Sequence, residues 1–259
     1  MPRMPTLFLS HGSPMHAVQS GVAGDMWQAV GAALPRSRAL VIASAHWETS
    51  RPMLTGSKQP ETIHDFGGFP EALYRIRYAA PGAPDLAARA AQLLRDNGLD
   101  AAVDPQRGLD HGAWVPLMLM YPEYDIPVTQ VSIQSRLGPA HHLRLGRAIS
   151  GLRQDALILC TGSFTHSLRL MDRSGVNAPE PQWVREFSDY IHMALIEGRT
   201  DDLLKYRQQA PFAERAHPED DHFMPLFVAV GAGGSRARAE RLHASATYGT
   251  LRMDAYAFS

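Results

Sequence analysis

Histidines stand directly after several apolar stretches of this 259-residue chain, where their imidazoles could gather around a metal ion. His11 follows the run LFLS, His46 follows LVIASA, and His166 follows ILCTGSFT. If these runs are parallel strands, their carboxyl ends meet at one edge of a sheet, and the three imidazoles would lie near a common ligand. Imidazole binds zinc and iron well, and catalytic metal sites usually take about three protein ligands. The pattern therefore predicts a metal site at that edge.

Further histidines could join the site from loops or helix starts, namely His64, His111, His217 and His222. No HExxH or CxxC spacing is present, so no single pair is a specific signal. Any one of these residues taken alone is more often held in a loop or core by a backbone hydrogen bond. The repetition of strand, then histidine, then a small or aromatic residue favours the metal site. The other five histidines lack this context, and the adjacent pair His141 and His142 is expected to be solvated on a helix.

Short apolar runs of strand length alternate with segments of helical spacing along the chain. The runs span Thr6 to Leu9, Ala39 to Ala43, Tyr74 to Tyr78, Pro127 to Ile133, Ala156 to Cys160, and Ala246 to Phe258. The helical segments span Asp25 to Leu34, Asp85 to Asn97, Trp114 to Tyr121, Pro139 to Leu152, Trp183 to Glu197, and His222 to Val230. Most runs are continuous rather than alternating, which is typical of a sheet covered on both faces. We expect an α/β fold, in which residues 1–259 form a single catalytic domain with a central mostly parallel or mixed sheet covered by helices. The stretch from Ser50 to Pro70 is predicted to be a long loop.

The charge balance favours a small-molecule partner over a polymer. The chain has 25 basic and 26 acidic residues and a formal charge of -1, so we expect no nucleic acid and no membrane partner. No apolar run approaches the roughly 20 residues of a transmembrane helix. The N-terminus also lacks the features of a secretory signal, which predicts a cytoplasmic protein. The single cysteine, Cys160, lies in the apolar run ALILC and is expected to be buried and inert.

Six motifs in order resemble those of a known enzyme family. They are LFLSHGSP, SAHWE, TIHDFGGFP, GLDHGAWVPL, TGSFTH and HPEDDHFMPL, and they run from residue 7 to residue 226. Together they are similar to the class III extradiol ring-cleavage dioxygenases, with the greatest similarity to the DOPA 4,5-dioxygenase branch. The resemblance covers nearly the whole chain.

The resemblance implies one divalent metal ion, Zn²⁺ or Fe²⁺, bound by His11, His46 and His222. In the catechol-cleaving relatives the third ligand is a glutamate, whereas the matching position here is histidine. His166 would be the acid/base residue, and its place as a fourth metal ligand stays open. His111 resembles a second catalytic histidine that contacts substrate or oxygen.

The implied reaction opens the ring of a catechol with O₂ and gives a 2-hydroxymuconic semialdehyde-type product. The adjacent oxygens of a catechol can chelate one metal, and an imidazole with a pKa near 6.5 can take a hydroxyl proton. His64 lies in a loop that should flank the pocket. Trp47, Phe66 and Trp114 are candidate walls for the aromatic ring, although each fits core packing equally well.

Two other functions use the same histidines. A zinc hydrolase would activate water on the metal and would need a carboxylate base, for which Glu219 or Asp220 is available. Glu219, Asp220 and Asp221 are also alternatives to His222 as metal ligands. A non-enzymatic metal-binding relative is the other possibility, although the presence of both His111 and His166 favours an enzyme. Neither the particular catechol nor the oligomeric state follows from the sequence.

Overall fold

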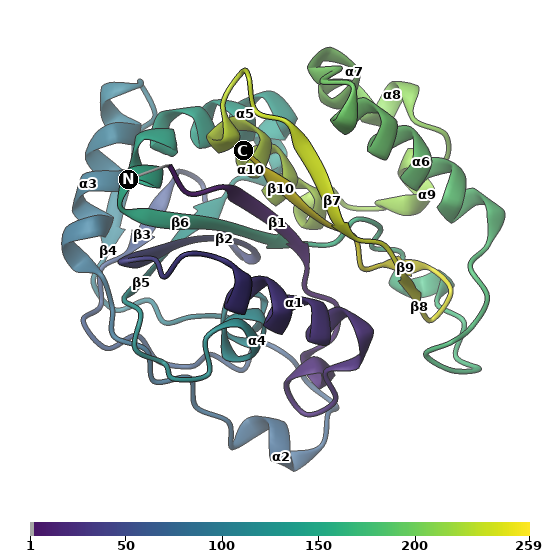
Figure 1. The fold of residues 1–259 in the computed structure, drawn as a ribbon, viewed down its shortest axis with the longest axis horizontal. Coiled ribbons are helices and arrows are strands. Elements are labelled where there is room, and N and C mark those ends of the chain that lie inside the picture. Colours follow the sequence, from purple (N-terminus) through teal and green to yellow (C-terminus); the bar gives the residue numbers. More distant parts are fainter. Residues whose placement is uncertain (1–2) are drawn as a thin grey trace.

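Eight strands form one mixed sheet at the centre of the computed structural model, which describes residues 3–259 (Figure 1). Strands β5, β2, β6 and β1 are parallel neighbours in the middle, and antiparallel pairs β3 with β5, β1 with β10 and β10 with β7 extend the sheet. In spatial order the strands are β4 (Ala102–Asp104), β3 (Met53–Thr55), β5 (Val128–Ile133), β2 (Ala39–Glu48), β6 (Ala156–Gly162), β1 (Thr6–Ser10), β10 (Ala255–Phe258) and β7 (Ala239–His243). The predicted α/β class with a mixed, helix-covered sheet is confirmed.

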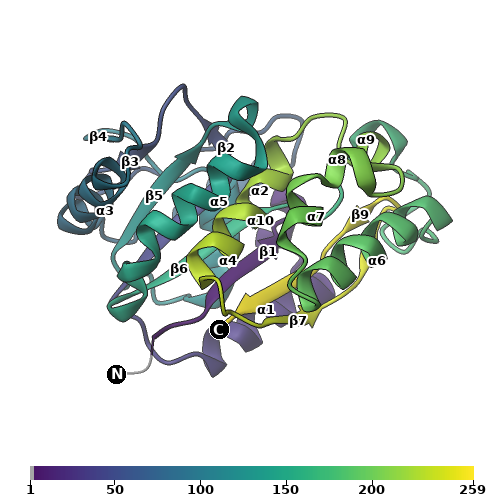
Figure 2. The same ribbon diagram turned by 90° about the horizontal axis from the view of Figure 1, so that it is seen from above.

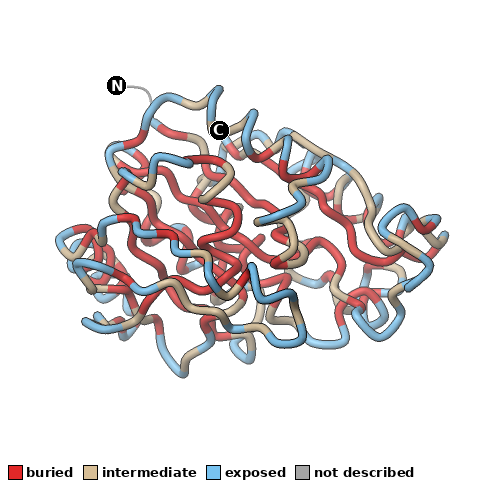
Figure 3. Tube along the Cα trace, turned by 90° about the horizontal axis from the view of Figure 1, so that it is seen from below, coloured by how far each residue is buried: buried red, intermediate tan, exposed pale blue. Residues whose placement is uncertain are grey.

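The sheet is buried on both faces, which explains the continuous apolar runs. In β6, Ile158 and Cys160 belong to the core on one face, whereas Leu157 and Leu159 belong to the core on the other. Successive side chains of a strand point to opposite faces, so a central strand such as β6 is apolar at most of its positions. Figure 3 shows these strands as a buried centre inside a largely exposed rim.

Helices cover the two faces unequally. Helices α1 (Gly21–Ala33) and α4 (His111–Met120) cover one face, and α3 (Pro84–Asp96), α5 (Gly138–Ile149) and α10 (Met224–Gly233) cover the other (Figures 1 and 2). Helix α6 (Gln182–Ile196) packs in the same core as α3, α5 and α10, at the end of the sheet near β7. The shorter elements are α2 (Glu71–Tyr74), α7 (Thr200–Leu204), α8 (Tyr206–Gln209), α9 (Ala213–Ala216) and the small pair β8 (Ala246–Thr247) and β9 (Leu251–Arg252). Within residues 3–259, no helix has both the length and the apolar character needed to cross a bilayer.

Several predicted elements are wrong. Tyr74 to Tyr78 is not a strand: α2 ends at Tyr74, and the chain continues irregularly to the fully buried Tyr78. Ile76 and Tyr78, two residues apart, pack against the core under α4, and the segment does not join the sheet. The last apolar run is broken into β8, β9 and β10, because Tyr248 and Gly249 adopt positive φ and form a turn.

Three short strands escape sequence prediction. β3 lies inside the segment predicted as a loop from Ser50 to Pro70, so that prediction holds only outside β3. β4 and β7 have three and five residues and include exposed positions. Such short edge strands have too few buried residues to produce an apolar run.

Candidate active site

Three histidines from distant parts of the chain meet at the carboxyl edge of the parallel strands. His11 follows β1, His46 lies near the end of β2, and His222 lies in the 3₁₀ turn Asp221–Phe223 that precedes α10. Strand β6 runs between β1 and β2. Its last residue, Gly162, lets the turn approach closely, since a Cβ at this position would lie 2.2 Å from the His222 carbonyl oxygen.

The Nε2 atoms of these imidazoles face one another. His46 Nε2 lies 3.0 Å from His11 Nε2 and 3.3 Å from His222 Nε2. With metal–nitrogen bonds of about 2.0–2.1 Å, two ligands about 90° to 110° apart are separated by about 2.8–3.4 Å. The three nitrogens therefore have the spacing of ligands around a single ion, and this part of the chain fits a divalent metal.

Burial keeps these imidazoles neutral, as metal ligation requires. It holds the pKa values of His11 and His222 well below the ordinary value, and the neighbouring imidazoles lower them further. Burial likewise lowers the pKa of His46 to about 4, with His111 acting in the same direction and the Asp110 and Asp65 carboxylates opposing it. At neutral pH each ring thus has a free lone pair on one nitrogen.

Two carboxylates contact the outer nitrogens of the cluster. His222 Nδ1 donates to Asp221 Oδ2 at 2.9 Å. Asp65 lies between two rings, with Oδ2 3.2 Å from His46 Nδ1 and Oδ1 3.0 Å from His111 Nδ1. Burial alone would raise the pKa of Asp65, but hydrogen bonding and charge from His111, aided by His46, bring it down to about 2. Asp65 follows His64 directly but is not among the predicted site residues, because a loop carboxylate has no sequence pattern of its own.

A fully buried carboxylate, Asp110, sets the start of α4 beside the site. It accepts from Ser44 Oγ at 2.6 Å and also from Gln130 Nε2, and it caps the helix by accepting from Ala113 N. The helix therefore begins at His111 and not at Trp114 as predicted, because Asp110 supplies the N-cap.

Two further histidines border the cluster. The His166 ring stacks on the His222 ring with centroids 3.5 Å apart and an interplanar angle of 11°. Burial lowers the pKa of His166, and the Asp221 carboxylate opposes this shift. The His111 ring lies 4.0 Å from the His46 ring between centroids. All five histidines implied by the resemblance as ligands or catalytic groups thus lie in one cluster.

Aromatic side chains line the side of the cluster next to His111. The Phe66 ring lies 5.6 Å from the His111 ring and 6.3 Å from the Trp114 ring, and His64 lies 5.7 Å from Phe66. Trp114 is fully buried and donates from Nε1 to the Ile63 carbonyl oxygen. These residues form an aromatic wall, defined here as His64, Phe66 and Trp114.

Trp47 is placed differently from the aromatic wall. It follows His46 in β2, so its side chain points to the opposite face of the strand. Its ring lies under the Arg107 guanidinium at 5.2 Å.

The remaining candidates have other contacts. His217 is fully buried, its Nε2 donates to the Phe164 carbonyl oxygen at 3.0 Å, and burial lowers its pKa to about 3. Asp220 is held by Arg207 and Tyr206. Glu219 lies on a polar cleft of about 820 Å³ that Asp221 also borders.

Of two predictions about residues outside the site, the one for His142 is wrong and the one for Cys160 is confirmed. His142 is fully buried and not solvated: Gln134 N donates to its Nε2, and its Nδ1 donates to the Gly138 carbonyl oxygen. The two backbone partners satisfy both nitrogens of a neutral ring. Cys160 is buried as predicted, and burial raises its pKa.

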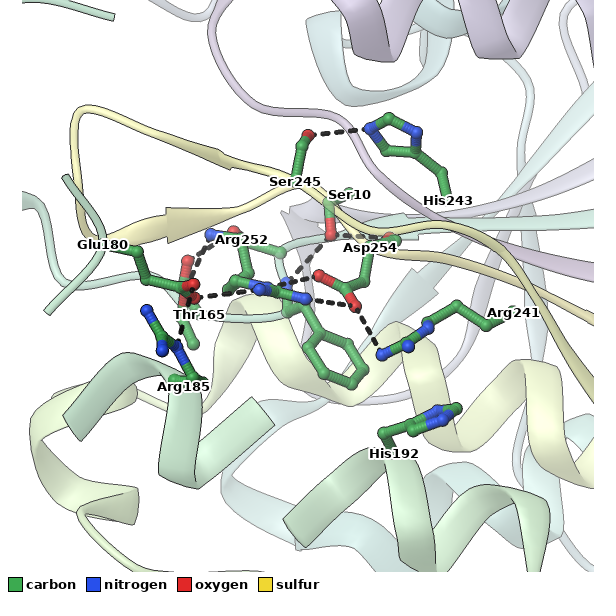
Figure 4. Close-up of polar contacts among 12 residues, drawn as sticks. Ser10, Thr165, Glu180, Arg185, His192, Arg241, His243, Ser245, Arg252 and Asp254 are labelled. Carbon is green, nitrogen blue, oxygen red and sulfur yellow. Dashed lines mark hydrogen bonds and ion pairs between the residues drawn. The ribbon is translucent and has the colours of Figure 1, made fainter. Parts of the chain in front are cut away.

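Arg252 and Asp254 form a buried ion pair, and their backbones hydrogen-bond to two segments that lead into the cluster (Figure 4). Arg252 Nε donates to Asp254 Oδ2 at 2.6 Å. Ser10 Oγ donates to the Asp254 carbonyl oxygen at 2.9 Å, and Arg252 N donates to Thr165 Oγ1 at 2.8 Å. Because Ser10 and Thr165 each directly precede a histidine of the cluster, the Arg252–Asp254 pair helps to hold both segments in place.

The chain is similar to ring-opening dioxygenases along nearly its whole length. Residues 5–259 match the family described as the catalytic LigB subunit of aromatic ring-opening dioxygenase. A 4,5-DOPA dioxygenase extradiol of Beta vulgaris is 42% identical over 261 residues, covering 98% of this chain and 96% of the relative. A protein of the same name from Escherichia coli K12 is 39% identical over 235 residues, covering 89% and 85%.

A solved structure has the same fold. The crystal structure of an uncharacterised protein from Escherichia coli K12 superposes with a TM-score of 0.84 at 31% sequence identity. The match covers 99% of this chain and 100% of the other chain. The resemblance inferred from the six motifs is therefore confirmed.

Proposed function

Because the chain belongs to the LigB family of aromatic ring-opening dioxygenases and is an extradiol ring-cleavage enzyme, we propose that its histidine cluster binds one divalent metal ion and a catechol. Relatives named for 4,5-DOPA support a DOPA-like catechol as the substrate. The reaction consumes one O₂ for each catechol and places both oxygen atoms in a 2-hydroxymuconic semialdehyde-type product.

The observation that supports the proposal most directly is that the Nε2 atoms of three neutral imidazoles face one another. His11, His46 and His222 face one another at 3.0 and 3.3 Å, and burial keeps all three unprotonated. Buried lone pairs so close together repel unless a cation or a shared proton lies between them. A cation ligated by all three removes the repulsion at every pair.

The metal is assigned from the chemistry that the reaction needs. A divalent ion on these imidazoles would supply a Lewis acid for the two catechol oxygens and, if it is iron, a path for electrons to oxygen. Zinc has no accessible redox change. We therefore assign Fe²⁺ as the working metal and Zn²⁺ as a competitor for the same three nitrogens.

His166 is assigned as the acid/base residue and not as a fourth ligand. Its ring is nearly parallel to the His222 ring, with centroids 3.5 Å apart, so the lone pairs of the two imidazoles lie in separate parallel planes and do not meet at one atom. Burial favours the neutral form of His166, which can accept a proton from a catechol hydroxyl and return it later in the reaction.

The aromatic wall gives the substrate ring a place to bind. His64 and Phe66 are partly exposed and offer a face or an edge for stacking against an aromatic ring, and the buried Trp114 packs behind them. The polar cleft beside Asp221 has room for a polar side chain on the catechol. Trp47 lies under Arg107, so we assign it to packing and not to substrate contact.

A hydrolytic function on the same metal has less support. Asp220, one of the carboxylates available as a base, is held by Arg207 and Tyr206. Family membership also favours ring opening over hydrolysis and over a non-enzymatic binding role.

The test is anaerobic reconstitution with Fe²⁺, followed by air and a panel of catechols including DOPA. We expect oxygen uptake in a 1:1 ratio with catechol and a yellow semialdehyde in the wild-type protein. His11→Ala should abolish both, whereas the control His141→Ala, which removes an imidazole outside the cluster, should retain both. Reconstituted wild-type protein that takes up no oxygen with any catechol would refute the proposal.

A further inference from the structure

The Asp65 carboxylate contacts two imidazoles of the cluster at once. Its two oxygens are divided between them, Oδ2 lying 3.2 Å from His46 Nδ1 and Oδ1 lying 3.0 Å from His111 Nδ1. Oδ1 also accepts a hydrogen bond from the His111 backbone N at 2.9 Å. The side chain is 22% exposed, so it is partly shielded from water.

Contact at Nδ1 decides what each ring can do at its other nitrogen. A carboxylate charge 3.0–3.2 Å from Nδ1 repels a lone pair there and attracts an N–H, so it favours the tautomer with the proton on Nδ1 and the lone pair on Nε2. In His46 that Nε2 is the atom directed at His11 Nε2, 3.0 Å away. In His111 the same tautomer leaves Nε2 free to accept a proton or a hydrogen bond from a substrate hydroxyl.

The segment that carries Asp65 is hydrogen-bonded to the start of α4 and to the residues just before it. Ile63 N donates to the Leu109 carbonyl oxygen at 2.8 Å, and Trp114 Nε1 donates to the Ile63 carbonyl oxygen at 2.9 Å. Ile63 is two residues from Asp65, and Trp114 belongs to α4, so these hydrogen bonds hold the segment of Asp65 against the start of that helix. The carboxylate is thus held on a frame that also holds His111.

We propose that Asp65 is a positioning residue that sets the orientation and tautomer of His46 and His111 together. The inference rests on the proposed metal site and extends it to a residue that contacts no substrate. Outer carboxylates of this kind usually contribute a factor of about 10–100 in metal affinity or activity. Here one carboxylate serves both a ligand and a catalytic histidine.

Asp65→Asn tests the carboxylate without removing the loop contact. The amide keeps one oxygen that can accept from the His111 backbone N, but its NH₂ group faces the other ring with a donor. It therefore cannot present an oxygen to both Nδ1 atoms, and it carries no charge. Glu61→Gln, the same chemical change at an exposed position of the same segment, is the matched control.

The measurements are the Zn²⁺ dissociation constant by chelator competition, the Co²⁺ absorption spectrum without substrate, and kcat and KM at saturating Fe²⁺. We expect Asp65→Asn to weaken Zn²⁺ binding about 10–100-fold, to alter the Co²⁺ spectrum, and to lower kcat more than it raises KM. Glu61→Gln should match the wild-type protein in all three. A purely structural role would lower thermal stability and leave the Co²⁺ spectrum unchanged.

The outcomes separate this inference from the proposed function. If His11→Ala loses Zn²⁺ while Asp65→Asn binds it as the wild-type protein does, the metal site stands and the role of Asp65 is wrong. If neither substitution affects Zn²⁺ binding, the proposed metal site itself fails. Binding of two Zn²⁺ ions per chain, with one lost in Asp65→Asn, would make Asp65 a ligand and would also overturn the inference.

Discussion

Gly162→Ala should disturb the metal site without touching any imidazole. The added Cβ would lie 2.2 Å from the His222 carbonyl oxygen and 3.3 Å from Pro225 Cγ. Carbon–oxygen contacts settle at about 3.3–3.6 Å, so the turn carrying His222 must move by about 1 Å. Gly162 also accepts a hydrogen bond from His11 N, and the shift therefore acts between two proposed ligands.

A displacement of about 1 Å near reacting groups typically costs about 100-fold in rate, and overpacking costs about 1–3 kcal/mol of stability. We expect kcat/KM to fall about 100-fold and Zn²⁺ binding to weaken, with a melting temperature several degrees lower. The assays are oxygen uptake with a catechol, chelator competition for Zn²⁺, and thermal unfolding.

Gly151→Ala is the matched control, because no atom lies within 4 Å of the Cβ it would add. This variant should match the wild-type protein in metal binding and turnover. The reasoning is refuted if Gly162→Ala binds Zn²⁺ and turns over within twofold of the wild-type protein, since the turn would then have absorbed the methyl group without moving His222.

Three other predictions test separate parts of the structure. His166→Ala should keep most of the bound metal and lose turnover; an equal loss of metal, measured by chelator competition, would make His166 a ligand. Asp254→Asn should destabilise the protein by no more than about 3–5 kcal/mol, because it removes the fully buried carboxylate beside Arg252 but leaves the ion pair between Arg252 and Glu180. Arg241→Gln, at the half-exposed end of the same cluster and 4.0 Å from Asp254, should cost less than about 1 kcal/mol; equal shifts of the urea midpoint would contradict this. Burial lowers the pKa of His142 to about 4, below its unfolded value of about 6.5, so the unfolded chain binds the proton more readily and stability should fall as the pH falls from about 6.5 to 4. His142→Gln should flatten that part of the urea midpoint profile, and an unchanged slope would show that His142 does not cause it.

Sequence patterns were sufficient where the signal is local. The runs before His11 and His46 are continuous and apolar because β1 and β2 lie between two cores. Strands buried on both faces are largely apolar, so histidines that directly follow apolar runs mark the carboxyl edge of the sheet. The fold class and the location of the histidine cluster follow from that pattern.

The same local patterns failed for elements that depend on distant partners. β3 and β4 have three residues each, and they form because β4 pairs with β3 and β3 pairs with β5. The segment Tyr74 to Tyr78 has a strand-like pattern, but it packs under α4 and finds no strand to pair with. Pairing is a property of two segments, and a single segment does not encode it.

The sequence by itself determined which residue types stand at the ends of the central strands, and the motifs identified the family to which they belong. Only the tertiary structure decided how Gly162 lets the turn of His222 cross the end of β6, and how Asp65 comes to lie between His46 and His111. The physical reason is that burial leaves a periodic trace along one segment, whereas a close approach between segments 60 or more residues apart, such as Gly162 and His222, depends on the path of the whole chain.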